Sequence, residues 1–397
     1  MSVRAYASEQ HDSANVCLNH SLTFNPANGW SAPFPPLDSE RTLIVVFAKC
    51  ENPVDWKPLS ELIAAFPQSK IIGCSSNTVT NDGNLLEDST SVGIIRFRDA
   101  ELRIAKAKIG DFDDSRAAGL LIGAELHDIN LKGVLLFSDG ETSDATAIVR
   151  GMQEMLLPEI TIAGGLSGGG YAEGSVTPWV LSDGGIRPMS ACAVGLIGPT
   201  VEVVPATGGG WRQIGKDCIS TRSHRRSLFE LDGRPAVDVY REFIRNNTGE
   251  GQTFKIVDYP LAIGTEGLEM QIVRDVVEID DTNGALVLAG DIPKNAVVRV
   301  MHSNADDILD GVDEAIERLC SKTILPKSNA LCICISCMGR KLVMGNMTAE
   351  EPRRVQEKLG SKISQVGFYA FGEISTTTSG SPYVHNQTIT LVMIREF

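Results

Sequence analysis

The sequence lacks any apolar segment long enough to cross a membrane, since its longest hydrophobic runs fall well short of about 20 residues. Its first residues also lack the basic segment and apolar run of a secretory signal peptide. Positive charge is scarce, because 36 Lys and Arg residues face 50 Asp and Glu residues. Nucleic-acid and anionic-membrane surfaces need clustered basic side chains. We therefore expect a cytoplasmic protein with no membrane span and no nucleic-acid partner.

Paired cysteines and common metal motifs are also lacking. The nine cysteines are odd in number and scattered along a chain of 397 residues, whereas small secreted scaffolds carry dense, paired cysteines. Reduced thiols fit this pattern better. The sequence contains no His-Glu-x-x-His element and no acidic calcium-binding loop, so these two kinds of metal site are not expected.

What the sequence does contain is a pattern that occurs three times. An apolar run of strand length is followed by an amphipathic segment of helix length and a second apolar run, beginning at Leu43, Gly133 and Leu331. Apolar strands joined through helices are typical of parallel sheets that are buried on both faces. Alternating stretches between the copies predict hairpins. We therefore predict a two-domain α/β protein with mixed, largely parallel sheets and repeated β-α-β units.

Composition changes along the chain suggest where its parts begin and end. Prolines and weak periodicity predict an irregular amino-terminal lead-in over residues 1–40. A glycine-rich stretch at 207–211 and a basic stretch at 221–226 place a boundary near residue 220. The expected domains therefore span residues 41–220 and 221–397.

Five motifs together resemble the FIST family in its amino-terminal and carboxy-terminal parts. The motifs are Ile72-Gly-Cys-Ser-Ser76, Leu231-Asp-Gly-Arg-Pro-Ala-Val-Asp-Val-Tyr240, Ser336-Cys-Met-Gly-Arg340, Gly367-Phe-Tyr-Ala-Phe-Gly-Glu-Ile374 and His385-Asn-Gln-Thr-Ile-Thr390. The three carboxy-terminal motifs are the more specific, because they occur in order at suitable spacing. The resemblance covers residues 40–397.

The resemblance implies an intracellular sensory protein without catalytic residues. Such a protein would bind a small ligand, such as an amino acid, and relay its presence to a signalling partner such as a histidine kinase. A stand-alone subset of the family is similar to haem-containing nitric-oxide sensors, and this chain resembles that subset in layout. FIST-like regions also occur in proteins that recruit substrates, so a protein-binding scaffold stays open as an alternative.

The ligand is expected at the carboxyl ends of the strands, where open α/β sheets bind small molecules. The candidate ligand-binding residues near these ends are Arg340, Glu373, His385, Asn386, Cys337 and Tyr369. The two-donor fork of Arg340 suits a ligand carboxylate and Glu373 suits an ammonium group, so together they suit a zwitterion. The alternative is an internal pair between Arg340 and Glu373 that closes two loops.

Three histidines are candidate axial ligands if haem is bound. His385 precedes a β-prone run, His302 follows another apolar run, and His224 lies among arginines. Imidazole is a common neutral metal ligand near pH 7. The alternatives are a hydrogen bond that fixes the loop at His385 and a position beside a helix cap at His302.

A hydrolase or transferase that uses Ser167 or Cys337 is the alternative from another class. Ser167 is the serine of a Gly-x-Ser-x-Gly pattern, but Pro178 and further glycines follow where a nucleophile elbow requires a helix. Cys337 has Cys-x-x-Cys spacing with Cys334, although the run before it is typical of a buried strand. Both patterns therefore favour structural roles.

Overall fold

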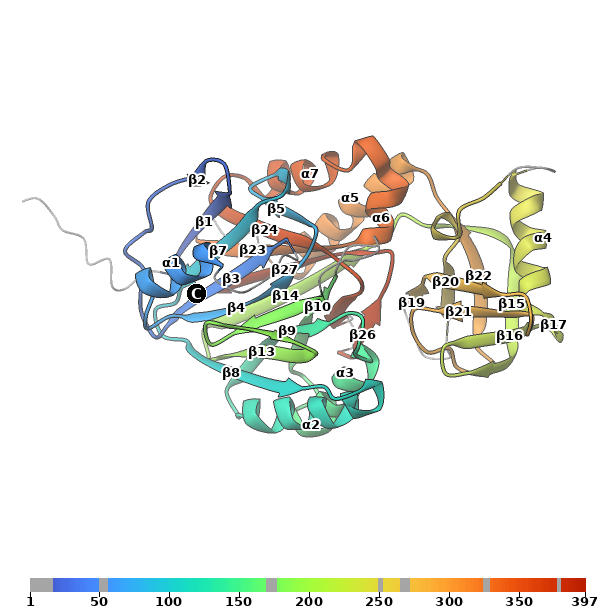
Figure 1. The fold of residues 1–397 in the computed structure, drawn as a ribbon, viewed down its shortest axis with the longest axis horizontal. Helices are drawn as coiled ribbons and strands as arrows, with labels where there is room; N and C mark the ends of the chain where they lie inside the picture. The colour runs from blue at the N-terminus through green and yellow to red at the C-terminus, as the bar shows by residue number, and fades with distance from the viewer. Residues whose placement is uncertain are drawn as a thin grey trace, which may run out of the picture.

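The computed structural model describes residues 17–49, 56–168, 177–248, 253–264, 272–323, 329–376 and 380–397. These residues form four β-sheets and seven α-helices. Three sheets and six helices make up a large body, and the fourth sheet with helix α4 (Ala236–Thr248) forms a smaller lobe beside it (Figure 1).

The three body sheets draw strands from both halves of the chain. The first contains, in spatial order, β12 (Gly185–Pro188), β11 (Trp179–Ser182), β4 (Lys70–Ser75), β3 (Thr42–Ala48), β7 (Thr90–Arg96), β1 (Leu18–Asn25) and β2 (Gly29–Trp30). The second contains β26 (Pro382–His385), β25 (Glu373–Thr376), β10 (Thr161–Ser167), β9 (Leu131–Asp139), β13 (Ser190–Ile197) and β8 (Glu101–Lys108). The third contains β14 (Val201–Gly208), β27 (Ile389–Glu396), β23 (Ala330–Cys337), β24 (Ile363–Ala370), β5 (Thr78–Asn81) and β6 (Asn84–Glu87).

The sheets are mixed, but the expectation that they are largely parallel is wrong. Within the described residues only three strand pairs are parallel, namely β3 with β4, β9 with β10 and β23 with β24. The strands on either side of each parallel pair run antiparallel to it, as β13 does beside β9 and β27 beside β23. The sequence shows the apolar runs but not the direction of the remote strands that pair with them.

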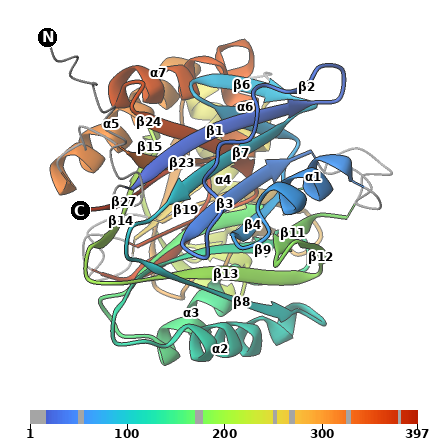
Figure 2. The same cartoon turned by 90° about the vertical axis from the view of Figure 1, so that its left-hand side faces the viewer.

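The body is layered, with helices outside and sheets inside. Helices α2 (Ser115–Leu126) and α3 (Ala145–Met155) cover one sheet, whereas α5 (Ala305–Lys322), α6 (Met338–Met344) and α7 (Glu350–Leu359) cover another (Figure 2). Helix α1 (Lys57–Ala65) packs on the first sheet. Between the sheets the rings of Phe47, Phe137 and Phe368 meet, with centroids 4.5–5.9 Å apart. This shared core fixes the three sheets relative to one another.

Helix α3 illustrates how the sequence places an element beside the site. The Asp144 side chain caps the helix by accepting from the Ala147 N–H at 3.0 Å, which satisfies one of the free amides of the first turn. Ile148, Val149 and Met152 form its buried stripe against the second sheet. The first turn of α3 is therefore held at the carboxyl end of β9, facing the lobe.

The lobe is inserted between β14 and α5. Its strands, in spatial order, are β19 (Ile272–Arg274), β18 (Leu261–Gly264), β22 (Val297–His302), β15 (Arg212–His224), β16 (Ser227–Leu231), β21 (Ala285–Leu288) and β20 (Val276–Asp280), and β17 (Arg234–Pro235) also pairs with β16. They enclose a separate hydrophobic core with α4. The chain enters and leaves through neighbouring strands, because Arg212 is the register partner of His302.

The body sheets contain strands from both sides of the boundary that the sequence predicts near residue 220. Residue 220 lies inside the uninterrupted strand β15, and strands from both sides of it share body sheets. The lead-in also differs from the irregular segment expected over residues 1–40, because β1 occupies Leu18–Asn25 and pairs with β7 along its length. A pairing with a distant strand, invisible in the local composition, fixes this segment.

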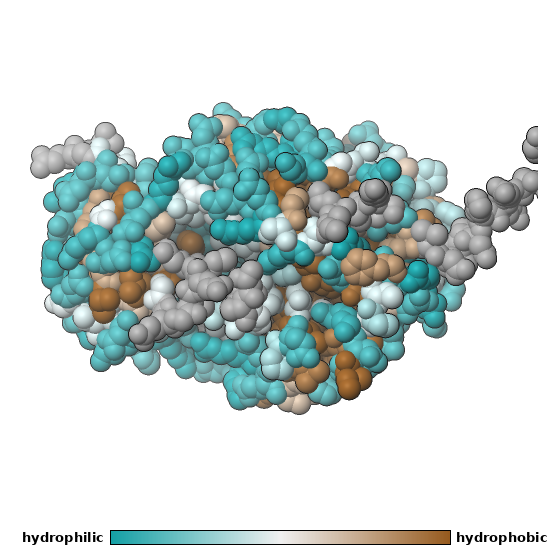
Figure 3. All heavy atoms as spheres, turned by 180° about the vertical axis from the view of Figure 1, so that it is seen from behind, coloured by the Kyte–Doolittle hydropathy of each residue, from teal (hydrophilic) through white to brown (hydrophobic). Residues whose placement is uncertain are grey.

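The face shown in Figure 3 is mostly hydrophilic, and its hydrophobic residues form small, separate patches. The more strongly exposed large apolar side chains of the described chain include Ile129 and Leu121 at one end of the body and Val277 in the lobe. None of the described helices combines the length and the apolar character needed to cross a membrane.

Candidate functional site

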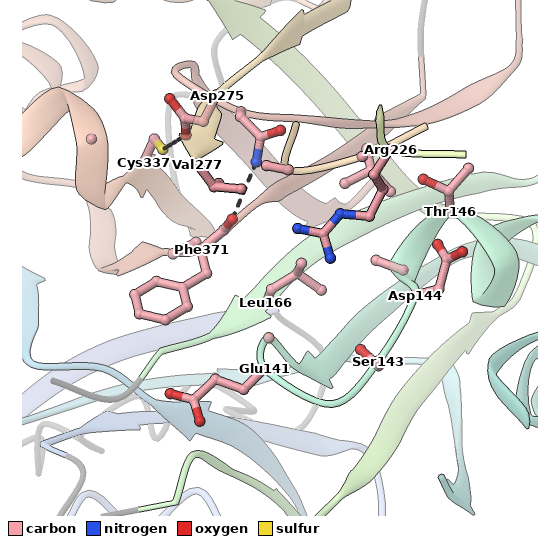
Figure 4. Close-up of a pocket in the computed structure, with 18 of the residues that line it drawn as sticks. Glu141, Ser143, Asp144, Thr146, Leu166, Arg226, Asp275, Val277, Cys337 and Phe371 are labelled. Carbon is pink, nitrogen blue, oxygen red and sulfur yellow. Dashed lines mark hydrogen bonds between the residues drawn. The ribbon is translucent and has the colours of Figure 1, made fainter. Parts of the chain in front are cut away.

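A cavity of about 210 Å³, which we call cavity 1, lies between the body and the lobe (Figure 4). Its body side is formed at the carboxyl ends of β9, β23 and β24 and at the first turn of α3. Its lobe side comes from the strand ends around Asp275 and Ala289. Residues that line it include Glu141, Asp144, Leu166, Arg226, Asp275, Val277, Gly290, Asp291, Cys337, Phe371 and Asn386. Small molecules bind at such strand ends in open α/β sheets.

Charged groups of both signs face cavity 1. The lobe contributes Arg226, whose Nε donates to the Leu288 carbonyl at 2.7 Å and whose guanidinium points toward the space between Leu166 and Phe371 (Figure 4). The body contributes Asp144 and Glu141 to the lining, although the Glu141 side chain extends away from Arg226 in Figure 4. Burial with the nearby Asp139 raises the pKa of Glu141. A zwitterion would find partners for both of its charges here.

Asp275 is the central polar group on the lobe side of cavity 1. Its Oδ1 accepts from Gln387 Nε2 at 2.6 Å, and its Oδ2 lies 3.9 Å from the Cys337 thiol. Burial raises the pKa of Asp275 to about 6, while the Gln387 hydrogen bond and the Arg274 charge oppose the rise. The carboxylate is thus joined to two body residues and lies at the boundary between the two parts.

Cys337 ends strand β23 and lines cavity 1 in a buried position. Burial, together with the carboxyl groups of Glu373 and Asp275, raises the pKa of the Cys337 thiol well above its ordinary value. A protonated thiol is a poor nucleophile. The cavity therefore offers Cys337 as a contact for a ligand, which does not favour a transferase or hydrolase mechanism.

Asn386 lies beside Cys337 in the wall of cavity 1 and bridges the body to the lobe. Its backbone N–H donates to the Val273 carbonyl at 3.1 Å, and its Nδ2 donates to the Phe371 carbonyl at 3.2 Å. The second of these bonds is the dashed line that ends at Phe371 in Figure 4. Its buried Oδ1 has no hydrogen-bond partner among the described residues. Asn386 and Cys337 are the two predicted ligand-binding residues that line cavity 1.

Glu373 and His385 lie behind cavity 1 and do not line it. They are register partners in the β25–β26 pair, and both are buried. Glu373 Oε2 accepts from the Thr388 backbone N–H and hydroxyl at 3.1 and 2.8 Å, and burial raises the Glu373 pKa well above its ordinary value. A neutral carboxyl at this depth does not provide the ammonium partner that we predicted.

Arg340 also has a structural place that differs from the predicted one. It is fully buried, its Nη2 lies 2.8 Å from Glu351 Oε1, and its other donors reach the carbonyls of Gly209 and Ile308. Tyr369 donates its hydroxyl to the second oxygen of Glu351 at 2.8 Å. An internal ion pair is therefore present, but its acid is Glu351 and not Glu373. Arg340 and Tyr369 therefore do not line cavity 1.

The three candidate histidines lie at separate places and do not fit haem. Burial lowers the pKa of His385 to about 3, and neither ring nitrogen has a partner among the described residues. His302 stacks on Tyr259 with ring centroids 4.7 Å apart and bonds through Nδ1 to the Asp258 carbonyl. Neither of these two histidines lines cavity 1 or the cavities beside Arg274 and His224.

His224 is exposed and lines a separate cavity of about 380 Å³, which we call cavity 3. The other walls of cavity 3 are almost entirely charged or polar. A haem macrocycle needs apolar walls, which this cavity does not supply. Among the described residues, no three His, Cys, Asp or Glu side chains converge as a metal site would require.

Ser167 has no catalytic surroundings in the described part of the chain. It ends strand β10, it is fully buried, and its hydroxyl has no hydrogen-bond partner there. A serine nucleophile needs a base within hydrogen-bond reach. Part of the glycine-rich pattern that follows it, residues 169–176, lies outside the described residues.

Sequence reasoning missed the residues that the lobe contributes, above all Asp275, Arg226 and Asp291. A signal for the first of these was present, because Arg274 and Asp275 stand as two charged residues within an otherwise apolar run from Ile272 to Val277. Two adjacent charges in a strand-like run indicate that the strand ends there or that the charges have buried partners.

Comparison with known proteins agrees with the motifs quoted above. Residues 42–234 match the FIST N domain and residues 236–376 match the FIST C domain. An uncharacterized protein of Mycobacterium bovis and one of Mycobacterium tuberculosis are each 22% identical to the chain over 343 residues. Each match covers 84% of this chain and 85% of the relative.

Proposed function

The chain belongs to the FIST family, and on this premise we propose that it binds a small zwitterionic ligand, such as an amino acid, in cavity 1. FIST domains are associated with sensing in signal transduction. In this proposal a histidine kinase is the partner that reads the occupied state. The free cysteines of the described chain suit a reducing compartment, so we place the protein in the cytoplasm.

The observation that carries the proposal is the two-sided wall of cavity 1. Cys337 and Asn386 belong to the body, whereas Asp275 and Arg226 belong to the lobe. A ligand that contacts both sides binds more tightly to the arrangement in which they are close. Such differential binding shifts the population of lobe positions, which is what a partner requires in order to detect the ligand.

Gln387 connects this wall to the lobe. Its side-chain amide donates to Asp275 and to the Val257 carbonyl, and its backbone carbonyl accepts from Trp211 Nε1 at 2.7 Å. A ligand that binds Asp275 either replaces the hydrogen bond from Gln387 or forms a further bond beside it. Occupancy of cavity 1 is therefore coupled to the contact that holds the lobe on the body.

The test is thermal unfolding of the full chain with each of the twenty common amino acids. A ligand at 100 times its Kd stabilises the folded state by about 2.7 kcal/mol, so the Tm should rise by several degrees. Asp275→Asn should lose that rise. Asp281→Asn is the matched control, because Asp281 is an exposed lobe carboxylate that pairs with Arg241 outside the cavity. An unchanged Tm across the panel would show that this ligand class is wrong.

A further inference from the structure

A second cavity of about 300 Å³, cavity 2, lies farther along the same face of the lobe. It separates α3 and β26 of the body from β18 and β19 of the lobe. Most of its wall is apolar, including Val149, Ile263, Ile272, Pro382 and Tyr383. Walls of this kind favour a ligand with a hydrophobic body, because each buried methylene stabilises binding.

One buried cation, Arg274, lines this apolar cavity. Its side chain is only 4% exposed, and its Nη1 donates to the carbonyls of Val384 and Val273. Its buried Nε has no hydrogen-bond partner in the described part of the chain. The carboxylates of Asp291, Asp144 and Asp275 act on the guanidinium through their charge alone and not through a hydrogen bond. Burial lowers the pKa of Arg274 to about 10, against the opposing charges of Asp291 and other carboxylates.

The surroundings of Arg274 leave room for its head group. Residue 290 is glycine, and a Cβ there would lie 2.7 Å from Arg274 Nε, so a larger residue would displace the guanidinium. A buried guanidinium without an anionic partner is unfavourable. An anion in cavity 2 would remove that cost.

We propose that cavity 2 is a binding site for a monocarboxylate with an aromatic or branched aliphatic body. The carboxylate accepts from the guanidinium of Arg274, and the body packs against Val149, Ile263 and Ile272. This site goes beyond the amino-acid proposal, and it functions whether or not cavity 1 binds a ligand.

The charges around cavity 2 favour a carboxylate without an ammonium group. Arg150 and Arg274 line it with one acid, Asp291, so the positive charges outnumber the negative one. Asp291 is partly exposed and lines all three cavities. An ion pair between an ammonium group and a partly exposed carboxylate contributes little binding free energy, because both groups must give up bound water. An α-amino acid would therefore lose more than it gains by entering cavity 2.

The test is calorimetric titration of the full chain with four probes: 3-phenylpropanoate, 4-methylpentanoate, 3-phenylpropylamine and L-phenylalanine. Both carboxylates should bind with a Kd below about 1 mM. The amine should bind at least tenfold more weakly, and L-phenylalanine more weakly than 3-phenylpropanoate. Failure of both carboxylates to bind would overturn the site, and tighter binding of L-phenylalanine would overturn the assignment to a plain carboxylate.

Two variants locate the binding. Arg274→Lys keeps the charge but loses the planar two-donor fork. It should weaken the binding of 3-phenylpropanoate at least tenfold. Arg222→Lys is the control, because Arg222 is an exposed lobe residue that pairs with Glu230; it should leave the affinity unchanged. Equal affinity of the wild type and Arg274→Lys would overturn the proposal.

Arg150→Glu provides a test that does not disturb the interior. Arg150 is exposed on α3 and lines cavity 2, so its substitution leaves the core intact. The reversed charge should weaken the binding of both carboxylates at least threefold and strengthen the binding of the amine. If Arg274→Lys does not fold, Arg150→Glu alone tests the proposal. Unchanged affinities for all four probes would then overturn the proposed carboxylate site.

Discussion

Arg340 lies at the meeting point of α6, α5 and the chain that enters the lobe. Its guanidinium donates to Glu351, to the Ile308 carbonyl in α5 and to the Gly209 carbonyl. Glu351 is itself held by the Tyr369 hydroxyl. One buried ion pair and its hydrogen bonds thus connect three helices, a strand of the third sheet and the last residues before the lobe.

Removing Arg340 should be strongly destabilising. Arg340→Met leaves the Glu351 carboxylate buried and unpaired, so we expect a loss of about 3–5 kcal/mol in the free energy of unfolding by urea. Arg353→Met, which removes two exposed ion pairs on α7, should cost no more than about 1 kcal/mol. A loss below about 1 kcal/mol for Arg340→Met would contradict the structural role.

From the sequence alone, Arg340 is a candidate for binding a ligand carboxylate. A short motif identifies an arginine with a free two-donor fork, but it does not show which carboxylate will meet it. Glu351 lies one helix farther along the chain and comes into contact only because α6 and α7 pack on the same sheet. The existence of an internal pair was foreseen, whereas its partner depends on helix packing.

His385 should make stability depend on pH in a defined direction. The pKa of His385 is about 3 in the folded chain, compared with an ordinary 6.5. Between these two values the unfolded chain binds a proton at His385 and the folded chain does not. The stability associated with neutral His385 is complete above pH 6.5 and is lost as the pH falls. By pH 5 the loss amounts to about 2 kcal/mol.

His385→Leu should remove this loss. The difference in unfolding free energy between wild type and variant should shift by about 2 kcal/mol between pH 8 and pH 5, in favour of the variant at pH 5. Groups common to both proteins, such as Asp275, cancel in the comparison. Parallel pH curves for the two proteins would show that His385 is not buried in its neutral form.

At the scale of elements, the three parallel strand pairs share one detail. In each pair a glycine on the second strand is the register partner of a residue whose carbonyl approaches it closely. These register partners are Val46 with Gly73, Leu136 with Gly164, and Cys334 with Gly367. A Cβ at any of the three glycines would lie 1.8–2.1 Å from the partner carbonyl oxygen, so no side chain fits.

Gly164→Ala should therefore disrupt the β9–β10 pair. The added methyl group would meet the Leu136 carbonyl oxygen at 1.8 Å, and the backbone at Gly164 has a φ of +152°. We expect a loss of about 3 kcal/mol or more in urea unfolding. The control is Gly185→Ala, where the nearest atom would be 3.7 Å away and little change is expected. Similar losses for both variants would contradict the explanation.

Strands were easier to predict than their neighbours. Apolar runs identified β3, β9 and β23, because a strand buried on both faces has no polar side. The antiparallel partners come from remote segments; β27, for example, joins β14 to β23 from the carboxyl terminus. The packing of the whole sheet decides which remote strand pairs at each edge. The local sequence therefore does not show whether a given pair is parallel or antiparallel.

At the scale of the whole molecule, the lobe has its own core and should unfold with some independence. Leu286→Ala removes a fully buried side chain of that core and should destabilise the lobe by about 2–5 kcal/mol. Hydrogen exchange measured by mass spectrometry should then accelerate in β15–β22, whereas β3, β9 and β13 keep their wild-type protection. Equal acceleration in body and lobe would show that the two unfold as one unit.

Cavity 1 lies at the end of the strands where the sequence predicts a ligand, but only part of its lining was expected from the sequence. The sequence placed a ligand at the carboxyl ends of the strands, and cavity 1 lies there, lined by the predicted Cys337 and Asn386. The opposite wall comes from the lobe, around Asp275 and Arg226. No sequence motif relates these lobe residues to strand ends far along the chain, because only the docking of lobe on body brings them together.

The entry and exit of the lobe have a consequence for how easily this module could be replaced. Because Arg212 and His302 face each other across two adjacent strands, the insert departs and returns at points about 5 Å apart. A module with closely spaced ends imposes little closure cost on its host. One wall of cavity 1 therefore belongs to a module that could be replaced at little cost to the body, while the opposite wall stays on the body.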